Sequence, residues 1–147
     1  MRVCIVSSCG GHLTEVRALA SVYGQYAHFY AIDDVVALPT DMQGKTYVVT
    51  HSERDWKTLI NLVEAFRILR KERPDAILST GAGLAVPFSI VGRLLFGTRV
   101  IFVETMTRVT RPSLTGRIMY HLAHDFFYQW EGLRRFFPRG TCAGPLI

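Results

Sequence analysis

The sequence predicts a single α/β domain built on a doubly wound parallel sheet. Short apolar segments alternate with longer segments of helical periodicity along all 147 residues. Several short segments, such as residues 100–103, lack the in-and-out alternation of a half-buried strand, which is typical of strands covered by helices on both faces. Because this length suits one hydrophobic core and is short for two, we expect one domain over residues 1–147.

Six segments have the composition of strands, being short, β-branched or aromatic, and bounded by Gly, Pro, Asp or basic residues. They cover residues 3–7, 27–32, 46–50, 76–79, 99–103 and 126–129. Between the third and the fourth, apolar residues recur at helical spacing at Leu59, Leu62, Val63, Phe66 and Leu69. We expect that helix to end before Pro74. The alternation of strand and helix predicts a sheet of the Rossmann type.

Charge and composition indicate which kinds of partner and ligand the chain is expected to bind. Seventeen Lys and Arg against twelve Asp and Glu leave a net charge of +5, which favours an anionic partner. Because the basic residues are spread through helices and a loop rather than gathered in a tail, we expect no nucleic-acid partner. Three cysteines without CxxC spacing predict neither a zinc site nor a disulfide framework. We therefore expect a reducing, cytoplasmic environment and no metal or cofactor.

Two apolar segments bear on the membrane. The run that ends at Val6 is too short for a secretory signal. No stretch reaches the roughly 18 to 20 apolar residues that span a bilayer, and the nearest, residues 84–96, contains Arg93. This segment is either a helix buried against the sheet or an apolar surface that contacts a membrane.

Three loops that follow predicted strands carry the candidate site, because ligands of open parallel sheets bind at the carboxyl ends of strands. They are residues 7–12 (SSCGGH), 79–83 (STGAG) and 104–108 (ETMTR). The first two break at glycines before a helix, which leaves backbone N–H groups that can bind an anion. The third leads to Ser113, a suitable cap for the next helix. Together the loops would form one rim.

Each loop also has a purely structural interpretation. Glycines at such turns often serve close packing alone. A histidine at a helix start, such as His12, needs no further role. Glu104 and Arg108 would pair with each other across their loop, a contact that contributes little when exposed.

Nucleotide-binding and nucleophile motifs fit poorly. Asp33-Asp34 ends the second strand where a ribose-binding acid belongs, but Gly10 and Gly11 are adjacent and Leu13 stands where the dinucleotide fingerprint needs its third glycine. Neither glycine loop is followed by the Gly-Lys-Ser or Gly-Lys-Thr of a P-loop. A nucleophilic Cys9 paired with His12 lacks an evident orienting partner.

The order and spacing of several segments resemble a known family. The segments are residues 3–13 (VCIVSSCGGHL), 77–87 (ILSTGAGLAVP), 100–116 (VIFVETMTRVTRPSLTG), 129–131 (QWE) and 144–145 (GP). They are similar to the PssD/CpsF group of bacterial exopolysaccharide proteins. That group is similar to the acceptor-side subunit of the eukaryotic two-chain UDP-GlcNAc transferase and, more distantly, to the amino-terminal domain of MurG.

The resemblance implies the amino-terminal, Rossmann-like half of a GT-B glycosyltransferase. Such a half binds a lipid-diphosphate-linked saccharide as acceptor, while a separate chain that resembles a GT-B carboxyl-terminal domain binds the UDP-sugar. The implied reaction is an inverting sugar transfer without protein-bound metal, in exopolysaccharide or capsule biosynthesis. The implied location is peripheral, on the inner face of the cytoplasmic membrane. In the alternative, the chain is a non-catalytic anchor and activator of a partner that performs all the chemistry.

Carried onto this sequence, the resemblance assigns site residues. We expect His12 to be the catalytic base, since a histidine at a helix start can accept a proton near neutral pH. Glu104 is the rival base, or the residue that orients His12 or an acceptor hydroxyl. The residues expected to bind the acceptor and its diphosphate are Ser8, Gly10, Gly11, Thr80, Gly81, Gly83, Thr105 and Arg108. The residues expected to meet the membrane or lipid phosphates are Arg93, Arg111 and Arg117.

Overall fold

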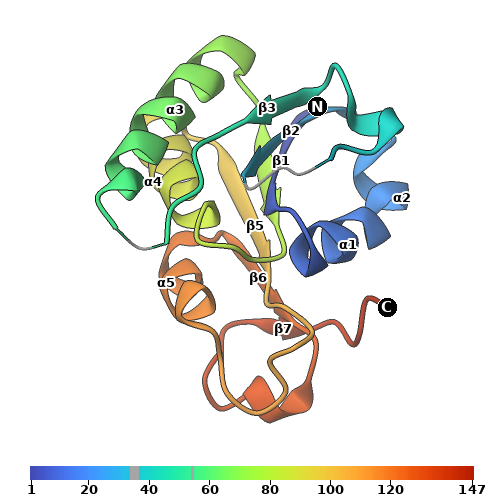
Figure 1. Cartoon of the computed structure of the whole chain (residues 1–147). Helices are drawn as coiled ribbons and strands as arrows, with labels where there is room; N and C mark the ends of the chain where they lie inside the picture. The colour runs from blue at the N-terminus through green and yellow to red at the C-terminus, as the bar shows by residue number, and fades with distance from the viewer. Residues whose placement is uncertain (34–36, 54) are drawn as a thin grey trace.

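A seven-stranded parallel sheet forms the centre of the chain (Figure 1). A computed structural model describes residues 1–33, 37–53 and 55–147, so Asp34 lies outside the described residues. The strand order is β3-β2-β1-β4-β5-β6-β7, and every neighbouring pair is parallel. The doubly wound α/β fold is confirmed. The strand order reverses between β1 and β4, and this is where such sheets form their ligand crevice.

The strands agree closely with those predicted. They are β1 (Arg2–Ser8), β2 (Ala27–Asp33), β3 (Thr46–Val48), β4 (Ala76–Ser79), β5 (Arg99–Val103), β6 (Asp125–Tyr128) and β7 (Thr141–Cys142). The first six correspond to the six predicted segments, with boundaries that differ by at most two residues. The short edge strand β7 was not predicted.

Helices cover both faces of the sheet. They are α1 (Gly11–Ala18), α2 (Ala20–Tyr23), α3 (Lys57–Glu72), α4 (Ala85–Phe96) and α5 (Leu114–Leu122), with 3-10 turns at η1 (Thr40–Met42) and η2 (Glu131–Leu133). Figure 1 shows α3, α4 and α5 on one face and α1 and α2 on the other. As predicted, α3 ends before Pro74, where Arg73 takes a left-handed conformation with φ 47°.

Successive residues of β1 enter two separate cores. Cys4 and Val6 pack in the cluster that contains Phe88 of α4, whereas Val3 and Ile5 pack with Val16 of α1. The uninterrupted apolar runs therefore reflect burial on both faces, as the sequence predicts. Burial also raises the pKa of the Cys4 thiol, so this cysteine behaves as a small apolar core residue.

Helix α4 is buried over most of its length and exposed near its end. Ala85, Phe88 and Val91 are buried against the sheet, whereas Leu94 and Leu95 near its end are 71% and 62% exposed. No helix in the described part of the chain is long and apolar enough to cross a bilayer.

An apolar pocket of about 270 Å³ lies on the opposite face of the sheet from α4. Its walls come from the sheet, from α2 and from residues near the C-terminus, and include Leu78, Ile101, Tyr23 and Leu146. It shares no lining residue with the polar pocket at the strand ends described below, so it is not part of the candidate site.

Candidate functional site

A polar pocket of about 230 Å³ lies at the carboxyl ends of β1, β4 and β5. Its lining residues come from three loops and two helix starts: His12, Gly81, Ala82, Gly83, Thr105, Thr107, Arg108, Ser113 and Thr115. The structure thus brings together His12, Gly81, Gly83, Thr105 and Arg108 as predicted. Ser8, Gly10, Gly11 and Thr80 do not line this pocket. Ser8 ends β1, Gly10 and Gly11 form the turn into α1, and Thr80 lies in the second glycine loop.

Both glycine loops determine the position of His12. Gly10, with φ 96°, lets the chain turn from β1 directly into α1, which places His12 in the first turn of that helix. The Thr80 hydroxyl donates a hydrogen bond to the His12 carbonyl oxygen at 2.9 Å. A Cβ atom at Gly81 would overlap the imidazole atoms Cε1 and Nδ1. Only glycine at position 81 therefore lets the second loop close onto the ring.

One nitrogen of this ring is buried. His12 Nδ1 has no hydrogen-bond partner among the residues that the structure describes. An orphaned buried polar atom is uncommon in proteins and is often found at functional sites. The side chain as a whole is half-buried and faces the polar pocket, so a bound hydroxyl group could reach the imidazole from that side.

The second glycine loop has a constrained backbone. Gly81 has φ 139°, and the next residue, Ala82, has φ 72°, a conformation that costs energy for a residue with a Cβ atom. The Ser79 hydroxyl donates to the Gly81 carbonyl oxygen at 2.8 Å and lies 3.3 Å from the Gly81 nitrogen, from which it accepts. Ser79 therefore fixes the turn that carries Gly81 onto the His12 ring.

Glu104 is buried and bonded to its own surroundings. Its carboxylate accepts hydrogen bonds from the Ser113 hydroxyl at 2.7 Å, the Ser113 backbone N–H at 3.0 Å and the Thr105 N–H at 3.1 Å. A Cβ atom at Gly116 would overlap Oε2 of this carboxylate. Ser113 also caps α5 as predicted, accepting from the Gly116 N–H at 2.8 Å.

The alternative in which Glu104 simply pairs with Arg108 is wrong. Within the described chain, no ion pair or hydrogen bond joins these two side chains, because the carboxylate is directed at the start of α5. Nor does any hydrogen bond join Glu104 to the His12 ring within the described residues.

Glu15 is a buried site residue that sequence reasoning missed. Its Oε1 atom accepts hydrogen bonds from the Thr105 hydroxyl at 2.7 Å and the Met106 N–H at 3.1 Å, which ties α1 to the loop after β5. In the sequence, the signal that could have pointed to Glu15 was its place next to the apolar Val16 in a predicted helix. Its partner lies 90 residues away, which no local pattern reveals.

Two residues of the QWE segment form hydrogen bonds to the loop after β5. Gln129 donates to the Glu104 carbonyl oxygen at 3.0 Å, and the Trp130 ring N–H donates to the Met106 carbonyl oxygen at 2.7 Å. The loop that carries Thr105, Thr107 and Arg108 is therefore held at several points, so its side chains have a defined position at the pocket.

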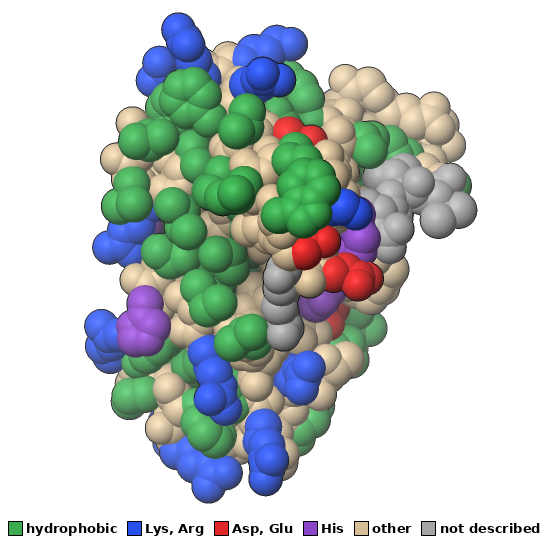
Figure 2. Space-filling view, turned by 60° about the vertical axis from the view of Figure 1, so that its left-hand side comes forward, with side chains coloured by type: hydrophobic (Ala, Val, Ile, Leu, Met, Phe, Trp, Pro, Cys, Tyr) green, Lys and Arg blue, Asp and Glu red, His purple; other side chains and the backbone are tan. Residues whose placement is uncertain are grey.

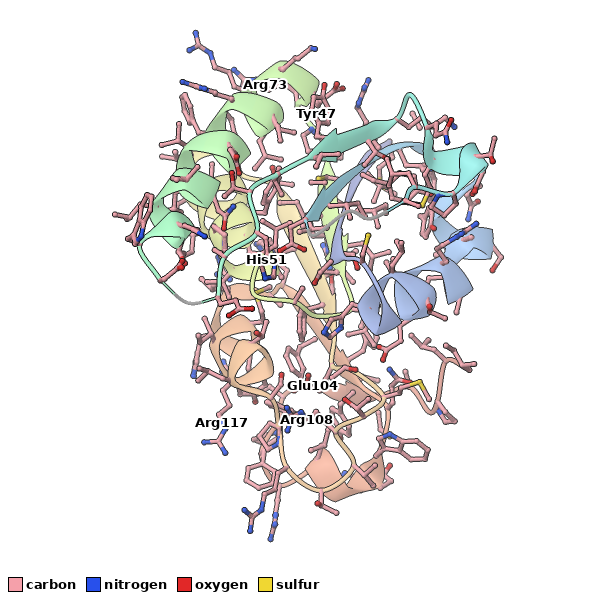
Figure 3. All side chains as sticks on the ribbon, in the orientation of Figure 1. Tyr47, His51, Arg73, Glu104, Arg108 and Arg117 are labelled. Atoms are coloured by element: carbon pink, nitrogen blue, oxygen red, sulfur yellow. The ribbon has the colours of Figure 1, made fainter. Side chains whose placement is uncertain are left out.

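Three arginines that were expected to meet anionic groups are exposed, and one of them, Arg108, lines the polar pocket. Arg108, Arg111 and Arg117 are exposed, and no ion pair joins them to another residue in the described ranges. Figure 3 shows Arg117 projecting from α5 away from the sheet. Arg93 differs from this prediction: its guanidinium is half-buried and donates to the Leu122 carbonyl oxygen at the end of α5, at 2.6 Å. That contact satisfies a helix terminus, so Arg93 has a structural role.

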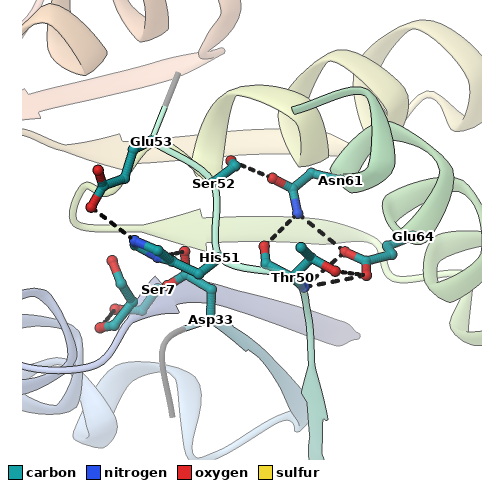
Figure 4. A network of polar contacts seen from close by, with 9 residues as sticks. Ser7, Asp33, Thr50, His51, Ser52, Glu53, Asn61 and Glu64 are labelled. Atoms are coloured by element: carbon teal, nitrogen blue, oxygen red, sulfur yellow. Dashed lines mark hydrogen bonds and ion pairs between the residues drawn. The ribbon is translucent and has the colours of Figure 1, made fainter. Parts of the chain in front are cut away.

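A second polar network lies at the ends of β2 and β3, beside Ser7 (Figure 4). His51 stands between two carboxylates, with Nδ1 3.2 Å from Asp33 and Nε2 3.4 Å from Glu53. Asn61 and Glu64 of α3 bind the Thr50 backbone. The network fixes the segment between β3 and α3. None of its members lines the polar pocket.

The chemistry available in the polar pocket follows from its lining. Arg108, the hydroxyl groups of Thr107 and Thr115, and the glycine-loop backbone suit an anionic, oxygen-rich ligand. The hydroxyl protons of Thr105 and Ser113 are already donated to Glu15 and Glu104. His12 adds a group that can accept a proton. Across residues 1–33, 37–53 and 55–147, no cluster of three His, Cys, Asp or Glu side chains is placed to hold a metal ion.

Comparison with solved structures defines the class of fold. The chain matches MurG from Acinetobacter baumannii over 89% of its length, with a TM-score of 0.70 and 19% identity. It matches UDP-N-acetylglucosamine 2-epimerase from Rickettsia bellii over 99% of its length, with a TM-score of 0.78 and 13% identity. The chain spans 42% and 45% of those two chains, less than half of each. Its fold is that of a Rossmann-like domain of the GT-B class.

Comparison of sequences gives the family. Residues 3–146 match the family described as "Oligosaccharide biosynthesis protein Alg14 like", and the chain belongs to it. The UDP-N-acetylglucosamine transferase subunit ALG14 of Homo sapiens is 26% identical over 180 residues, covering 100% of this chain and 83% of the human protein. The subunit of the same name from Saccharomyces cerevisiae is 38% identical over 55 residues, covering 37% of this chain and 23% of the yeast protein. The predicted similarity to the eukaryotic transferase subunit is confirmed.

Proposed function

We propose that this chain is the acceptor-binding, membrane-associated subunit of a two-chain inverting glycosyltransferase. In this proposal it binds a lipid-diphosphate-linked saccharide, and a sugar is transferred to that saccharide from a UDP-sugar. The observation that carries the proposal is the convergence of His12, Arg108 and both glycine loops at one polar pocket in a chain of the Alg14-like family.

The pocket residues divide the chemistry between them. Arg108 and the hydroxyl groups of Thr107 and Thr115 bind the acceptor diphosphate, since charge-assisted hydrogen bonds are the strong ones for such oxygens. His12 takes the proton from the acceptor hydroxyl as that oxygen bonds to the anomeric carbon. The bond from this carbon to the UDP oxygen breaks, UDP leaves with the electron pair, and attack from the opposite side inverts the configuration.

We assign Glu104 a positioning role rather than that of the base. Its carboxylate oxygens are occupied by Ser113 and Thr105 donors, and the side chain is fully buried. It shapes the wall of the pocket from which Ser113 and Thr115 project. Thr80 acts similarly, through the backbone of His12.

The UDP-sugar is assigned mainly to a partner chain. The chain corresponds to less than half of the MurG and epimerase chains that share its fold, and the relatives it matches are named as transferase subunits. We propose a partner that resembles a GT-B carboxyl-terminal domain. The setting in exopolysaccharide or capsule biosynthesis rests on the similarity of the sequence segments to the PssD/CpsF group.

An apolar face on α3, α4 and α5 supports a peripheral membrane location on the inner leaflet. We define this apolar face by its exposed large side chains: Trp56, Leu59, Val63, Phe66, Leu94, Leu95, Leu114 and Ile118. Figure 2 shows hydrophobic side chains spread over this side of the molecule, with Lys and Arg side chains toward both ends. Apolar residues with a basic rim suit the surface of an anionic bilayer.

The experiment is sugar transfer by the assembled pair, followed with labelled UDP-sugar and a lipid-diphosphate saccharide. We expect Arg108→Ala to raise the KM for the acceptor and leave the KM for the UDP-sugar unchanged. Arg17→Ala serves as a control, because Arg17 pairs with Asp41 and does not line the polar pocket. Transfer by the partner alone at the rate of the pair, or an unchanged acceptor KM in Arg108→Ala, would contradict the proposal.

A further inference from the structure

A groove of about 210 Å³ adjoins the polar pocket. Its walls come from the start of α3, from α4 and from α5: Ser52, Asp55, Thr58, Gly83, Val86, Leu114, Thr115 and Ile118. Gly83 and Thr115 line the polar pocket as well. The two hollows therefore adjoin at these residues, so a ligand bound in the polar pocket lies next to the groove.

The character of the surface changes along this path. The polar pocket presents Arg108, His12 and hydroxyl groups. Beyond Gly83 and Thr115, one wall of the groove is apolar, made by Val86, Leu114 and Ile118, while Ser52, Asp55 and Thr58 form the rest. Leu114 and Ile118 are 46% and 39% exposed and also belong to the apolar face. The groove therefore leads from the polar pocket to that face.

We propose that this groove binds the hydrocarbon chain esterified to the acceptor diphosphate, at the carbons nearest the phosphate; the inference rests on the proposed function. A lipid diphosphate has the required order of groups, an anion followed directly by hydrocarbon. A nucleotide-sugar would instead place a polar nucleoside or sugar against Leu114 and Ile118. Burying the hydrocarbon removes these side chains from water, and the path lets the lipid reach the site from the bilayer along one surface.

Binding of two defined probes by the whole chain tests the inference. The probes are farnesyl diphosphate, below its aggregation concentration, and methyl diphosphate, both followed by isothermal titration calorimetry. We expect the wild type to bind farnesyl diphosphate at least about tenfold more tightly, since burial of a few methylene groups gives a change of this size. In Leu114→Ser/Ile118→Ser the preference should fall toward onefold, with the affinity for methyl diphosphate unchanged.

The matched control is Leu94→Ser/Leu95→Ser. These residues lie on the same apolar face and are more exposed, but they do not line the groove, so the preference for farnesyl diphosphate should persist. If both double variants lose the preference equally, or neither loses it, the groove assignment is overturned. Nuclear Overhauser contacts between the farnesyl chain and the methyl groups of Val86, Leu114 and Ile118 test the same point on unaltered protein.

The two proposals fail in different ways. If the chain binds methyl diphosphate but gains nothing from the farnesyl group, the groove inference is overturned and the acceptor site stands. If the wild type binds neither probe, the proposed acceptor site is itself contradicted, and the groove inference with it.

Discussion

The position of His12 depends on the missing Cβ atom at Gly81 as well as on the hydrogen bond from Thr80. Gly81 has no Cβ atom where the imidazole lies, and the Thr80 hydroxyl holds the His12 carbonyl oxygen. The second glycine loop therefore acts on the histidine rather than lining the ligand pocket with backbone alone. This contact joins residues from the ends of β1 and β4, the two strands at which the strand order reverses.

Replacing Gly81 by Ala should destabilise the chain through this contact. The added Cβ atom would overlap the ring, and the residue would have to keep φ 139°, so we expect the free energy of unfolding to fall by about 1–3 kcal/mol. In a His12→Ala background the loss should be smaller, because only the backbone cost persists. Urea unfolding of the wild type, the two single variants and the double variant measures both losses.

Gly83→Ala is the control for the steric argument. A Cβ atom there meets nothing within 4 Å, so its effect on unfolding should be small. An equal loss from Gly81→Ala with and without the His12 ring would show that ring and loop are not coupled.

The sequence predicted which residues lie at the site better than it predicted what each of them contacts. His12, Gly81, Gly83, Thr105 and Arg108 do line one pocket, because strand ends of a parallel sheet meet at one edge. Whether a glycine faces a ligand or a neighbouring side chain depends on contacts between distant segments. Glu15 was missed for the same reason, since its partners lie 90 and 91 residues away.

At the scale of elements, Glu104 joins the end of β5 to the start of α5. Glu104→Gln keeps the size of the side chain but replaces an acceptor oxygen by an NH₂ group that faces Ser113 donors. We expect a loss of about 1–3 kcal/mol in the free energy of unfolding, the range for an unsatisfied buried polar group. Ser113→Ala removes both a cap and a partner, so the two losses should not add.

This cycle also separates the two roles considered for Glu104. A positioning residue predicts that transfer activity falls together with stability and recovers in part when the pair is stabilised by saturating acceptor. If Glu104→Gln unfolds like the wild type while the assembled pair loses transfer, the carboxylate is the base and the positioning role is wrong.

An ion pair between the first residues of β5 and β6 depends on pH. Arg99 donates to Asp125 at 2.6 and 3.0 Å, and this hydrogen bonding lowers the pKa of Asp125 below its usual range. A lowered pKa in the folded state stabilises the chain above the pKa of the unfolded state, and that contribution disappears as pH falls through the folded-state pKa.

Asp125→Asn should therefore be less stable than the wild type at pH 7 and indistinguishable from it below the folded-state pKa. The difference should be small because both side chains are partly exposed. Urea unfolding across this pH range measures it. A difference that grows as the solution is acidified would contradict the assignment.

Elements with a repeating pattern were predictable, and those without one were not. The six predicted strands and the end of α3 follow from composition and proline placement. Strand β7 has only two residues, too few for any periodicity, and forms because Thr141 and Cys142 pair with Phe127 and Tyr128. The dual character of α4 depends on where α3 and α5 pack beside it, which its own apolar sequence does not encode.

In the whole fold, the apolar face reaches the groove beside the candidate site, because Leu114 and Ile118 belong to both. Trp56 is 68% exposed on that face, whereas Trp130 is half-buried and hydrogen-bonded to the Met106 carbonyl oxygen. We expect tryptophan emission to shift to shorter wavelength on anionic vesicles at low salt, because indole rings favour the interfacial region of a bilayer.

The shift should disappear in Trp56→Phe and weaken at raised salt, where surface charges are screened. Fluorescence titration with vesicles of anionic and of neutral lipid measures both effects. No shift of the wild type on anionic vesicles at low salt, or a full shift in Trp56→Phe, would count against this face as the membrane surface.

The fold of the chain could be inferred from the sequence, but its apolar face could not. Composition and alternation predict a parallel α/β fold, which the structure confirms. The apolar face was not predicted as a unit, because its members come from three helices and are adjacent only in the folded chain. The proposed partner chain leaves no signal in the composition, and its prediction rests on the family resemblance.

The most direct test of the central claim is the rate of sugar transfer by the assembled pair with His12→Ala in this subunit. Acceptor binding and assembly are measured on the same sample. We predict that the rate falls by about 10² to 10⁴-fold, the usual contribution of a general base, while the pair stays assembled and binds acceptor. A rate within a few fold of the wild type, in an intact pair, would contradict a catalytic role for this chain.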